Sequence, residues 1–327
     1  MYPAGCPPFR WWVCRTPPCG KAATASVPPS KSLGFKWPDR HITVNLAPAD
    51  VRKTGPVYDL PLLLAVLASS GQLEELPADT AFLGELALDG ALRPVSGVLP
   101  MALAAAADGI KALYVPAENA AEAAEAGGTA MKVYPARTAR EVVDALRGVT
   151  PIIPTVPLPF DPADSWNSAP DFADVMGQPL ARRAMVIAAA GGHNVLLIGA
   201  PGTGKSMLAK RLPGILPPLS RDEAVETTKI YSIAGQLPKG RGLITSRPFR
   251  SPITPPAPFR WRAAGPPSGP GECSLADCGV LIFGRTAGNF PVKVSKCCGS
   301  RWRTARSRSA ARRAAPPTLA GSNWSRP

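Results

Sequence analysis

The sequence predicts an α/β protein of two domains, in which an α+β domain precedes part of an α/β domain built around a phosphate-binding loop. Two patterns predict this fold class. Residues 32–148 alternate short strand and helix patterns, and residues 195–212 (VLLIGAPGTGKSMLAKRL) read as a buried strand, a glycine-bearing turn and a helix. Residues 149–170 between them hold six prolines without apolar periodicity, which is typical of a stiff linker.

The composition is that of a globular chain with unusual ends. Of the 327 residues 45% are hydrophobic, which is enough for ordinary cores in two domains. No apolar run reaches the length of a membrane span, and the first thirty residues lack the layout of a signal peptide. We therefore expect a cytoplasmic protein with no membrane partner.

Most of the positive charge lies in the last quarter of the chain. Residues 241–327 carry a formal charge of +13, out of +14 for the whole chain. Residues 284–327 are Arg-, Ser- and Ala-rich without an apolar period, and are predicted to be a basic, disordered tail. Their RWRTARSRSAARR stretch is either a nucleic-acid-binding arm or a basic tail without a partner.

The seven cysteines lie only in the flanks, at 6, 14, 19, 273, 278, 297 and 298. No C-x-x-C pair exists among them, and the two histidines, His41 and His193, lie far from them in the sequence. These spacings do not predict a metal site. Residues 1–31 are crowded with Pro, Cys and Trp, and no packed element is predicted there.

The first domain is predicted from alternating elements along residues 32–148. Asp89-Gly90 is a strong hairpin signal, and the last helix has Thr138 as its cap and Gly148 as its stop. The predicted elements are a strand at 41–48, a helix at 60–70, two strands joined by the hairpin turn within 82–95, a helix at 101–109, a strand from 112 leading into a helix at 120–126, a strand at 131–136 and a helix at 138–148.

The second domain is predicted over residues 171–283. A turn and a helix at 171–192 precede the loop, and a helix at 220–230 follows it, with Asp222 and Glu223 in the first turn. ECSLADCGVLIF at 272–283 predicts a helical turn and a strand.

The turn fits G-x-x-x-x-G-K-[ST] at every fixed position. Its glycines let successive N–H groups turn around a phosphate, Lys205 would reach the β- and γ-phosphates, and the Ser206 hydroxyl would hold Mg²⁺. ATP and Mg²⁺ are therefore the expected ligands. The alternative is a glycine-rich turn with a surface lysine, which the flanking strand and helix disfavour. The predicted binding residues are Gly199, Ala200, Pro201, Gly202, Thr203, Gly204, Lys205 and Ser206.

Several longer strings resemble the ComM/YifB family of magnesium-chelatase-like AAA+ ATPases. They are GGHNVLLIG before the loop, FLGELALDGALRPVSGVLPMALAAA and VPAENAAEAA upstream, and PGECSLADCGVLIF downstream. The resemblance covers residues 32–250 and the last string in fragments. It implies a ribosomal-S5-like domain over 32–148, shared with the Lon protease domain, and a partial AAA+ domain over 171–283. It also implies a homohexamer that remodels DNA as a branch-migration motor.

The resemblance also predicts which residues contact the adenine base of ATP, and the chain lacks the catalytic residues of a related peptidase. Val175, Met176 and Gly177 fall where such modules contact adenine, although simple helix entry would explain the same turn. A Ser-Lys peptidase would place its nucleophile and base where this chain has Val57 and Leu99. The first domain is therefore interpreted as a Lon-like fold without peptidase chemistry.

A second departure concerns ATP hydrolysis. An AAA+ motor needs an Asp-Glu pair at the end of the strand next to the phosphate loop, to hold Mg²⁺ and polarise water. Gly284 and Arg285 occupy this Walker B position after GVLIF, and Ile253 and Thr254 occupy the place of the family's paired histidines. No later sensor or arginine finger is found. We expect binding without intact catalytic residues, in a truncated member of the family.

One hypothesis explains the losses: residues 1–31 and the segments beyond Ser251 are translated in shifted reading frames. The nucleotide sequence tests it, because another frame should restore an Asp-Glu strand end. Two other functions stay open. In the first, the chain would be the ATPase subunit of a magnesium chelatase, although such a subunit would not need the upstream domain. In the second, it would be a non-enzymatic nucleic-acid-binding protein that uses its basic tail.

Overall fold

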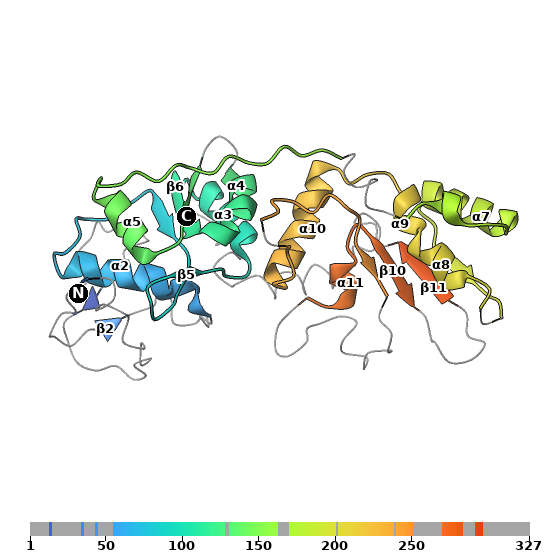
Figure 1. Ribbon diagram of the computed structural model, residues 1–327, viewed down its shortest axis with the longest axis horizontal. Coiled ribbons are helices and arrows are strands. Elements are labelled where there is room, and N and C mark those ends of the chain that lie inside the picture. Colours follow the sequence, from blue (N-terminus) through green and yellow to red (C-terminus); the bar gives the residue numbers. More distant parts are fainter. Residues whose placement is uncertain are drawn as a thin grey trace, which may run out of the picture. The chain divides into compact units, whose positions relative to one another are not determined.

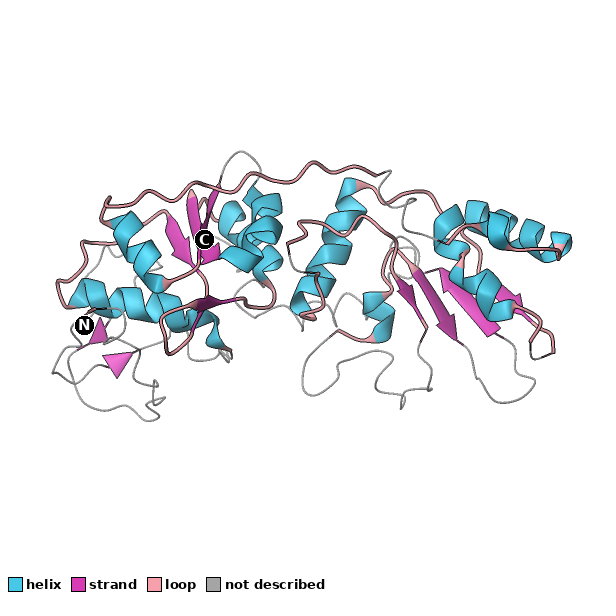
Figure 2. Ribbon diagram, in the orientation of Figure 1, coloured by secondary structure: helices cyan, strands magenta, loops and turns pink. Residues whose placement is uncertain are grey.

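The computed structural model describes two compact units, each with its own sheet and core (Figures 1 and 2). The units divide between Leu158 and Pro159, and residues 238–242 group with the first. In the described part of the chain, no helix combines the length and the apolar character needed to cross a membrane. The described residues are 13–14, 34–35, 43–44, 55–127, 131–162, 170–200, 202–238, 240–251, 270–283 and 292–296.

The first unit contains a three-stranded parallel sheet of order β3-β6-β7, with helices on both faces (Figure 1). Helices α3 and α4 make the crossovers and cover one face, while α2 and α5 cover the other. The elements are α2 (Asp59–Ser69), β3 (Thr80–Phe82), β4 (Glu85–Leu86), β5 (Leu92–Arg93), α3 (Val98–Ala107), β6 (Ala112–Pro116), α4 (Ala120–Gly127), β7 (Lys132–Ala136) and α5 (Ala139–Leu146), with short 3-10 turns at Pro56–Tyr58 and Ala117–Asn119.

Alternation along the strands divides the core of the first unit into two clusters. Leu113 and Val133 face α3 and α4, whereas Phe82, Tyr114 and Tyr134 face α2 and α5. The three aromatic rings stack across neighbouring strands, with centroids 5.3 and 4.9 Å apart. Such cross-strand aromatic pairs stabilise a sheet beyond their buried area.

The predicted elements of the first unit are largely confirmed, with shifts at their ends. Thr138 caps α5 by accepting a hydrogen bond from Glu141 N at 3.2 Å, and β4 pairs antiparallel with β5 across the expected turn. Phe82 was expected in that hairpin but belongs to β3, because Gly84 separates the two strands. Helix α3 begins at Val98, three residues before the predicted start.

Two segments at the edges of the first unit differ from expectation. Residues 1–31 were expected to contain no packed element, yet β1 (Val13–Cys14) pairs antiparallel with β2 (Thr43–Val44). The Trp-Trp-Val-Cys run favours strand, which explains the pairing. Thr155 N donates to Val133 O at 2.8 Å, so the proline-rich segment begins packed beside β7 rather than free of it.

The second unit contains a four-stranded sheet of order β8-β11-β10-β9. Strand β10 is parallel to β9 and antiparallel to β11, which is antiparallel to β8. The elements are a 3-10 turn η3 (Phe172–Asp174), α7 (Pro179–Gly191), β8 (Val195–Leu197), α8 (Lys205–Lys210), α9 (Leu212–Ile215), α10 (Arg221–Ile233), β9 (Phe249–Arg250), α11 (Glu272–Leu275), β10 (Val280–Phe283) and β11 (Val292–Lys296).

Strand β11 corrects two expectations. It lies inside 284–327, which was expected to be disordered, and its V-K-V-S-K alternation is an ordinary strand signal. It also separates β10 from β8, so β10 is not the strand next to the phosphate loop.

The predicted helix after the loop is divided at Arg211 into α8 and α9, because Pro213 lies in the first turn of α9.

One face of this sheet is covered by α7, α8 and α9. Val280 and Ile282 of β10 share a buried cluster with Met185, Leu208 and Ala209 from these helices. Strand β8 ends the sheet in the described residues. Exposed large apolar side chains of this unit belong to the turn before α7, α7, β8 with the residue after it, and α8, at Met176, Leu180, Val186, Ile187, Leu196, Ile198 and Met207.

The entry into β10 depends on a glycine. Val280 N donates to Pro248 O at 2.8 Å, which brings the backbone of Pro248 directly against Gly279. A Cβ at position 279 would overlap the Pro248 carbonyl oxygen. Because both groups belong to the backbone, a side chain here would displace one of the segments that pair in the sheet.

We expect Gly279→Ala to destabilise the second unit by about 3 kcal/mol, because the added methyl is overpacked against main chain. Urea unfolding measures this loss. Gly177→Ala is the matched control: its Cβ would meet nothing within 4 Å, so only its left-handed backbone is penalised, by about 1 kcal/mol. Equal effects of the two changes would contradict the close approach at Gly279.

Candidate phosphate-binding site

The loop between β8 and α8 has the backbone that a phosphate cradle needs. Gly202 and Gly204 have φ values of +83° and +82°, in the left-handed region that favours glycine. A Cβ at Gly202 would meet nothing within 4 Å, so backbone conformation rather than crowding requires glycine there. The turn delivers the chain from the end of a strand into the first turn of a helix, as the sequence predicted.

Lys205 lies at the centre of the loop. Its Nζ donates to Gly199 O at 2.7 Å, to Ala200 O at 2.5 Å and to Thr203 Oγ1 at 3.2 Å. The Thr203 hydroxyl in turn donates to Ala200 O at 2.9 Å. The loop is thus closed around one ammonium group. The three N–H donors of this group could equally bind the anionic oxygens of a phosphate placed in the loop.

Two side chains hold the turn before α7, one against the end of α8 and the other against this loop. Arg211 donates to Asp171 O at 2.9 Å and pairs with the Asp174 carboxylate at 3.3 Å. Gln178 Nε2 donates to Thr203 O at 2.8 Å. The segment that the sequence assigned to adenine contact is therefore held beside the segment assigned to phosphate contact.

The other predicted site residues have different surroundings. Ser206 is exposed at the start of α8, whereas Pro201 lies outside the described residues. Val175 is buried in the core beside α7, so its side chain is packed against protein. Met176 is 87% exposed, and Gly177 is also exposed, so two of the three residues predicted to contact adenine are accessible.

The donor set fits a nucleotide phosphate with Mg²⁺. The loop combines a lysine, left-handed glycines of the kind that turn backbone N–H groups towards an anion, and an exposed serine. Mg²⁺ takes oxygen ligands together with phosphates. Among the described residues, no group of three His, Cys, Asp or Glu side chains could hold a metal alone. A metal at this loop would therefore depend on oxygens of its ligand.

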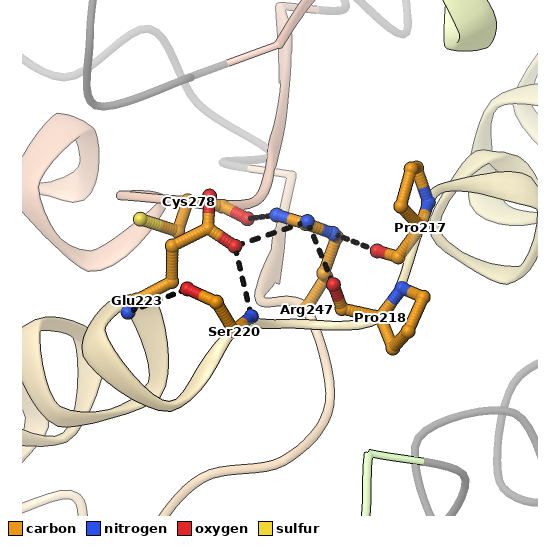
Figure 3. Close-up of polar contacts among 6 residues, drawn as sticks. All are labelled: Pro217, Pro218, Ser220, Glu223, Arg247 and Cys278. Atoms are coloured by element: carbon orange, nitrogen blue, oxygen red, sulfur yellow. Dashed lines mark hydrogen bonds and ion pairs between the residues drawn. The ribbon is translucent and has the colours of Figure 1, made fainter.

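Arg247 anchors the strand that supports this site (Figure 3). Its side chain is 7% exposed, and its guanidinium donates to Pro217 O at 2.5 Å, Cys278 O at 2.6 Å and Pro218 O at 3.2 Å. It also pairs with Glu223 at 3.2 Å, the residue that closes a capping box with Ser220 at the start of α10. One buried cation thus joins the loop before α10, the helix itself and the start of β10.

Cys278 occupies a strained and buried position in the same cluster. Its φ is +55°, which L residues rarely adopt, and the residue is 4% exposed. Burial, with smaller contributions from the nearby charges of Asp277 and Glu223, raises the pKa of the thiol to about 11. The neutral thiol is therefore the form that the fold accommodates.

The predicted catalytic departures fall partly outside the described residues. Gly284 and Arg285 lie there, as do Ile253 and Thr254. In the first unit, Leu99 is fully buried and Val57 packs against the cluster beside α3 and α4. Both are packing residues at the positions where a peptidase would carry its nucleophile and base.

Three residues that organise this site were not predicted from the sequence: Gln178, Arg211 and Arg247. Their partners lie 24 to 40 positions away, so no local pattern marks them. A left-handed glutamine is also not a pattern that composition predicts. The glycine beside Gln178 and the proline after it were the available signals, and they indicated only a turn.

Comparisons with known proteins agree with the site. The family model described as "Magnesium chelatase, subunit ChlI" matches residues 171–297, and "Subunit ChlI of Mg-chelatase" matches residues 26–119. Competence protein ComM of Haemophilus influenzae is 41% identical over 256 residues, which is 76% of this chain and 49% of that protein. YifB of Escherichia coli is 42% identical over 251 residues, 76% of this chain and 48% of that protein. This chain belongs to the ComM/YifB family.

Membership of this magnesium-chelatase-like family makes the chain an AAA+ ATPase-like protein. A shorter match joins 86 residues, 26% of this chain, to 18% of the DNA repair protein RadA of Treponema pallidum at 35% identity. The chain spans about half the length of the ComM and YifB relatives. The family-model match over residues 171–297 includes the phosphate loop and the segment before α7.

The Cys278 thiol predicts a pH dependence. Its pKa is raised on folding, so stability is fully present below about pH 9 and is lost as the pH rises towards 11, where the unfolded chain releases the proton first. We expect a loss of about 2 kcal/mol between pH 8 and pH 11. Cys278→Ala should remove this part of the decline in urea unfolding. A decline of the same size in both proteins would contradict it.

Proposed function

We propose that this chain binds ATP with Mg²⁺ through the loop from Gly199 to Ser206. The observation that carries the proposal is the position of the Lys205 ammonium, which donates to two loop carbonyls and to the Thr203 hydroxyl. Thr203 itself lies between two left-handed glycines. Lys205 would exchange these acceptors for phosphate oxygens, and Ser206 would ligate Mg²⁺. The exposed Met176 and Gly177 would contact the base.

Hydrolysis needs groups that this sequence does not provide where the family has them. Bound Mg²⁺ would neutralise charge on the phosphates, but a carboxylate is needed to orient the attacking water. Gly284 and Arg285 follow β10 in place of the Asp-Glu pair. We therefore propose nucleotide binding with turnover impaired relative to longer members of the family.

Thermal unfolding with and without MgATP tests the binding proposal. A ligand present at about 100 times its Kd stabilises the folded state by about 2.7 kcal/mol, so the melting temperature of the unmodified chain should rise by about 5 °C. Lys205→Ala should abolish this rise. Lys210→Ala, an exposed lysine on the same helix, should retain it. An unchanged rise in Lys205→Ala would refute the assigned site.

We further propose that DNA is the macromolecular partner and that the chain acts on it as a homo-oligomer. The names of the relatives support this: one is a competence protein and another a DNA repair protein. The same family resemblance supports a ribosomal-S5-like fold for residues 32–148, which would then serve recognition or assembly rather than peptide cleavage. A chelatase role would instead require a chelatase partner.

Binding of a fluorescent four-way DNA junction separates these possibilities. We expect MgATP to tighten binding by the full chain about tenfold, and this response to persist when the arginines within 301–313 are replaced by serine. Salt should weaken the phosphate contacts of both proteins. Binding that disappears with those arginines and never responds to nucleotide would instead support a nucleic-acid-binding tail.

A further inference from the structure

Gln178 has an unfavourable backbone at the start of α7. Its φ and ψ are +53° and +52°, in the left-handed region, and within the described chain only Gln178 and Cys278 are non-glycine residues with positive φ. Glycine adopts this conformation without steric penalty, and asparagine adopts it more readily than glutamine does. Position 178 is also exposed, so packing does not require a long side chain there.

The side chain compensates with a single contact to the phosphate loop. Gln178 Nε2 donates to Thr203 O at 2.8 Å, between the two left-handed glycines of the loop. A peptide unit is planar and trans, so its C=O and N–H point in opposite directions. By holding the Thr203 carbonyl, the amide also fixes the direction of the Gly204 N–H, which points away from Gln178.

Attachment of the segment alone does not require this bond. Arg211 already holds the same segment through Asp171 O and the Asp174 carboxylate. The buried side chains of Phe172 and Val175 anchor it in the core. A hydrogen bond at an exposed position adds little to folding, and strained residues of this kind concentrate at functional sites.

We propose that Gln178 is a positioning residue of the nucleotide site: its amide orients the Thr203–Gly204 peptide so that the Gly204 N–H is presented to a phosphate. This rests on the proposed binding of ATP at the loop. Gln178 acts through the loop backbone, and its contribution is to phosphate affinity rather than to the stability of the free protein.

The test separates affinity from stability in the full-length chain. The Kd for MgATP is measured by competition with a fluorescent ATP analogue, and the melting temperature is measured without nucleotide. Gln178→Gly removes both the amide and the backbone strain, so we expect Kd to rise about tenfold while the melting temperature stays equal or increases. Gln178→Glu keeps the length but replaces the donor by an acceptor, and should weaken binding at least as much.

Gln236→Ala is the matched control. It removes another exposed glutamine of the second unit, whose amide oxygen accepts from Arg250 at 3.4 Å, away from the loop. This variant should bind MgATP as the unmodified chain does. Inorganic pyrophosphate as competitor should show the same tenfold loss in Gln178→Gly, because the proposed effect acts on phosphates and not on the base.

Three outcomes would count against the proposal. Unchanged affinity in Gln178→Gly, with binding by the unmodified chain, would overturn this inference alone. A fall in melting temperature that accompanies the loss of affinity would show that the residue is structural. Absence of saturable MgATP binding by the unmodified chain would overturn the proposed function, and this inference with it.

Discussion

The buried guanidinium of Arg247 is the interaction on which the second unit most depends. It joins the loop before α10, the capped start of that helix and the carbonyl of Cys278, two residues before β10 (Figure 3). Strand β10 then packs Val280 and Ile282 beneath Leu208 of α8. A buried cation must have partners, because leaving it unpaired is strongly unfavourable. This requirement fixes β10, and β10 supports the helix that carries Lys205.

The phosphate loop could be predicted because its determinants are local. Left-handed glycines, a lysine and a serine at fixed spacing define the turn whatever surrounds it, and the cap at Thr138 follows from the same kind of short-range chemistry. Arg247, Arg211 and Gln178 could not be predicted, because their roles depend on carbonyls that folding brings from distant positions. Strand order is equally non-local, and the place of β11 between β8 and β10 had no sequence signal.

The proposed function separates nucleotide binding from hydrolysis. The groups assigned to phosphate binding lie together in one loop, whereas Gly284 and Arg285 replace the family's acidic pair. The chain matches about half the length of its ComM and YifB relatives, and apolar side chains around β8 are exposed. The phosphate loop supports the proposed nucleotide binding, and the replaced acidic pair supports the proposed impairment of turnover.

Isothermal titration of the purified chain with ATP, in Mg²⁺ and again in excess EDTA, tests the central claim most directly. We expect saturable binding of one nucleotide per chain in Mg²⁺, and weaker binding when the metal is removed, because Ser206 and the phosphates would share its coordination. Absence of saturable heat at millimolar ATP in the presence of Mg²⁺ would contradict the proposed nucleotide site.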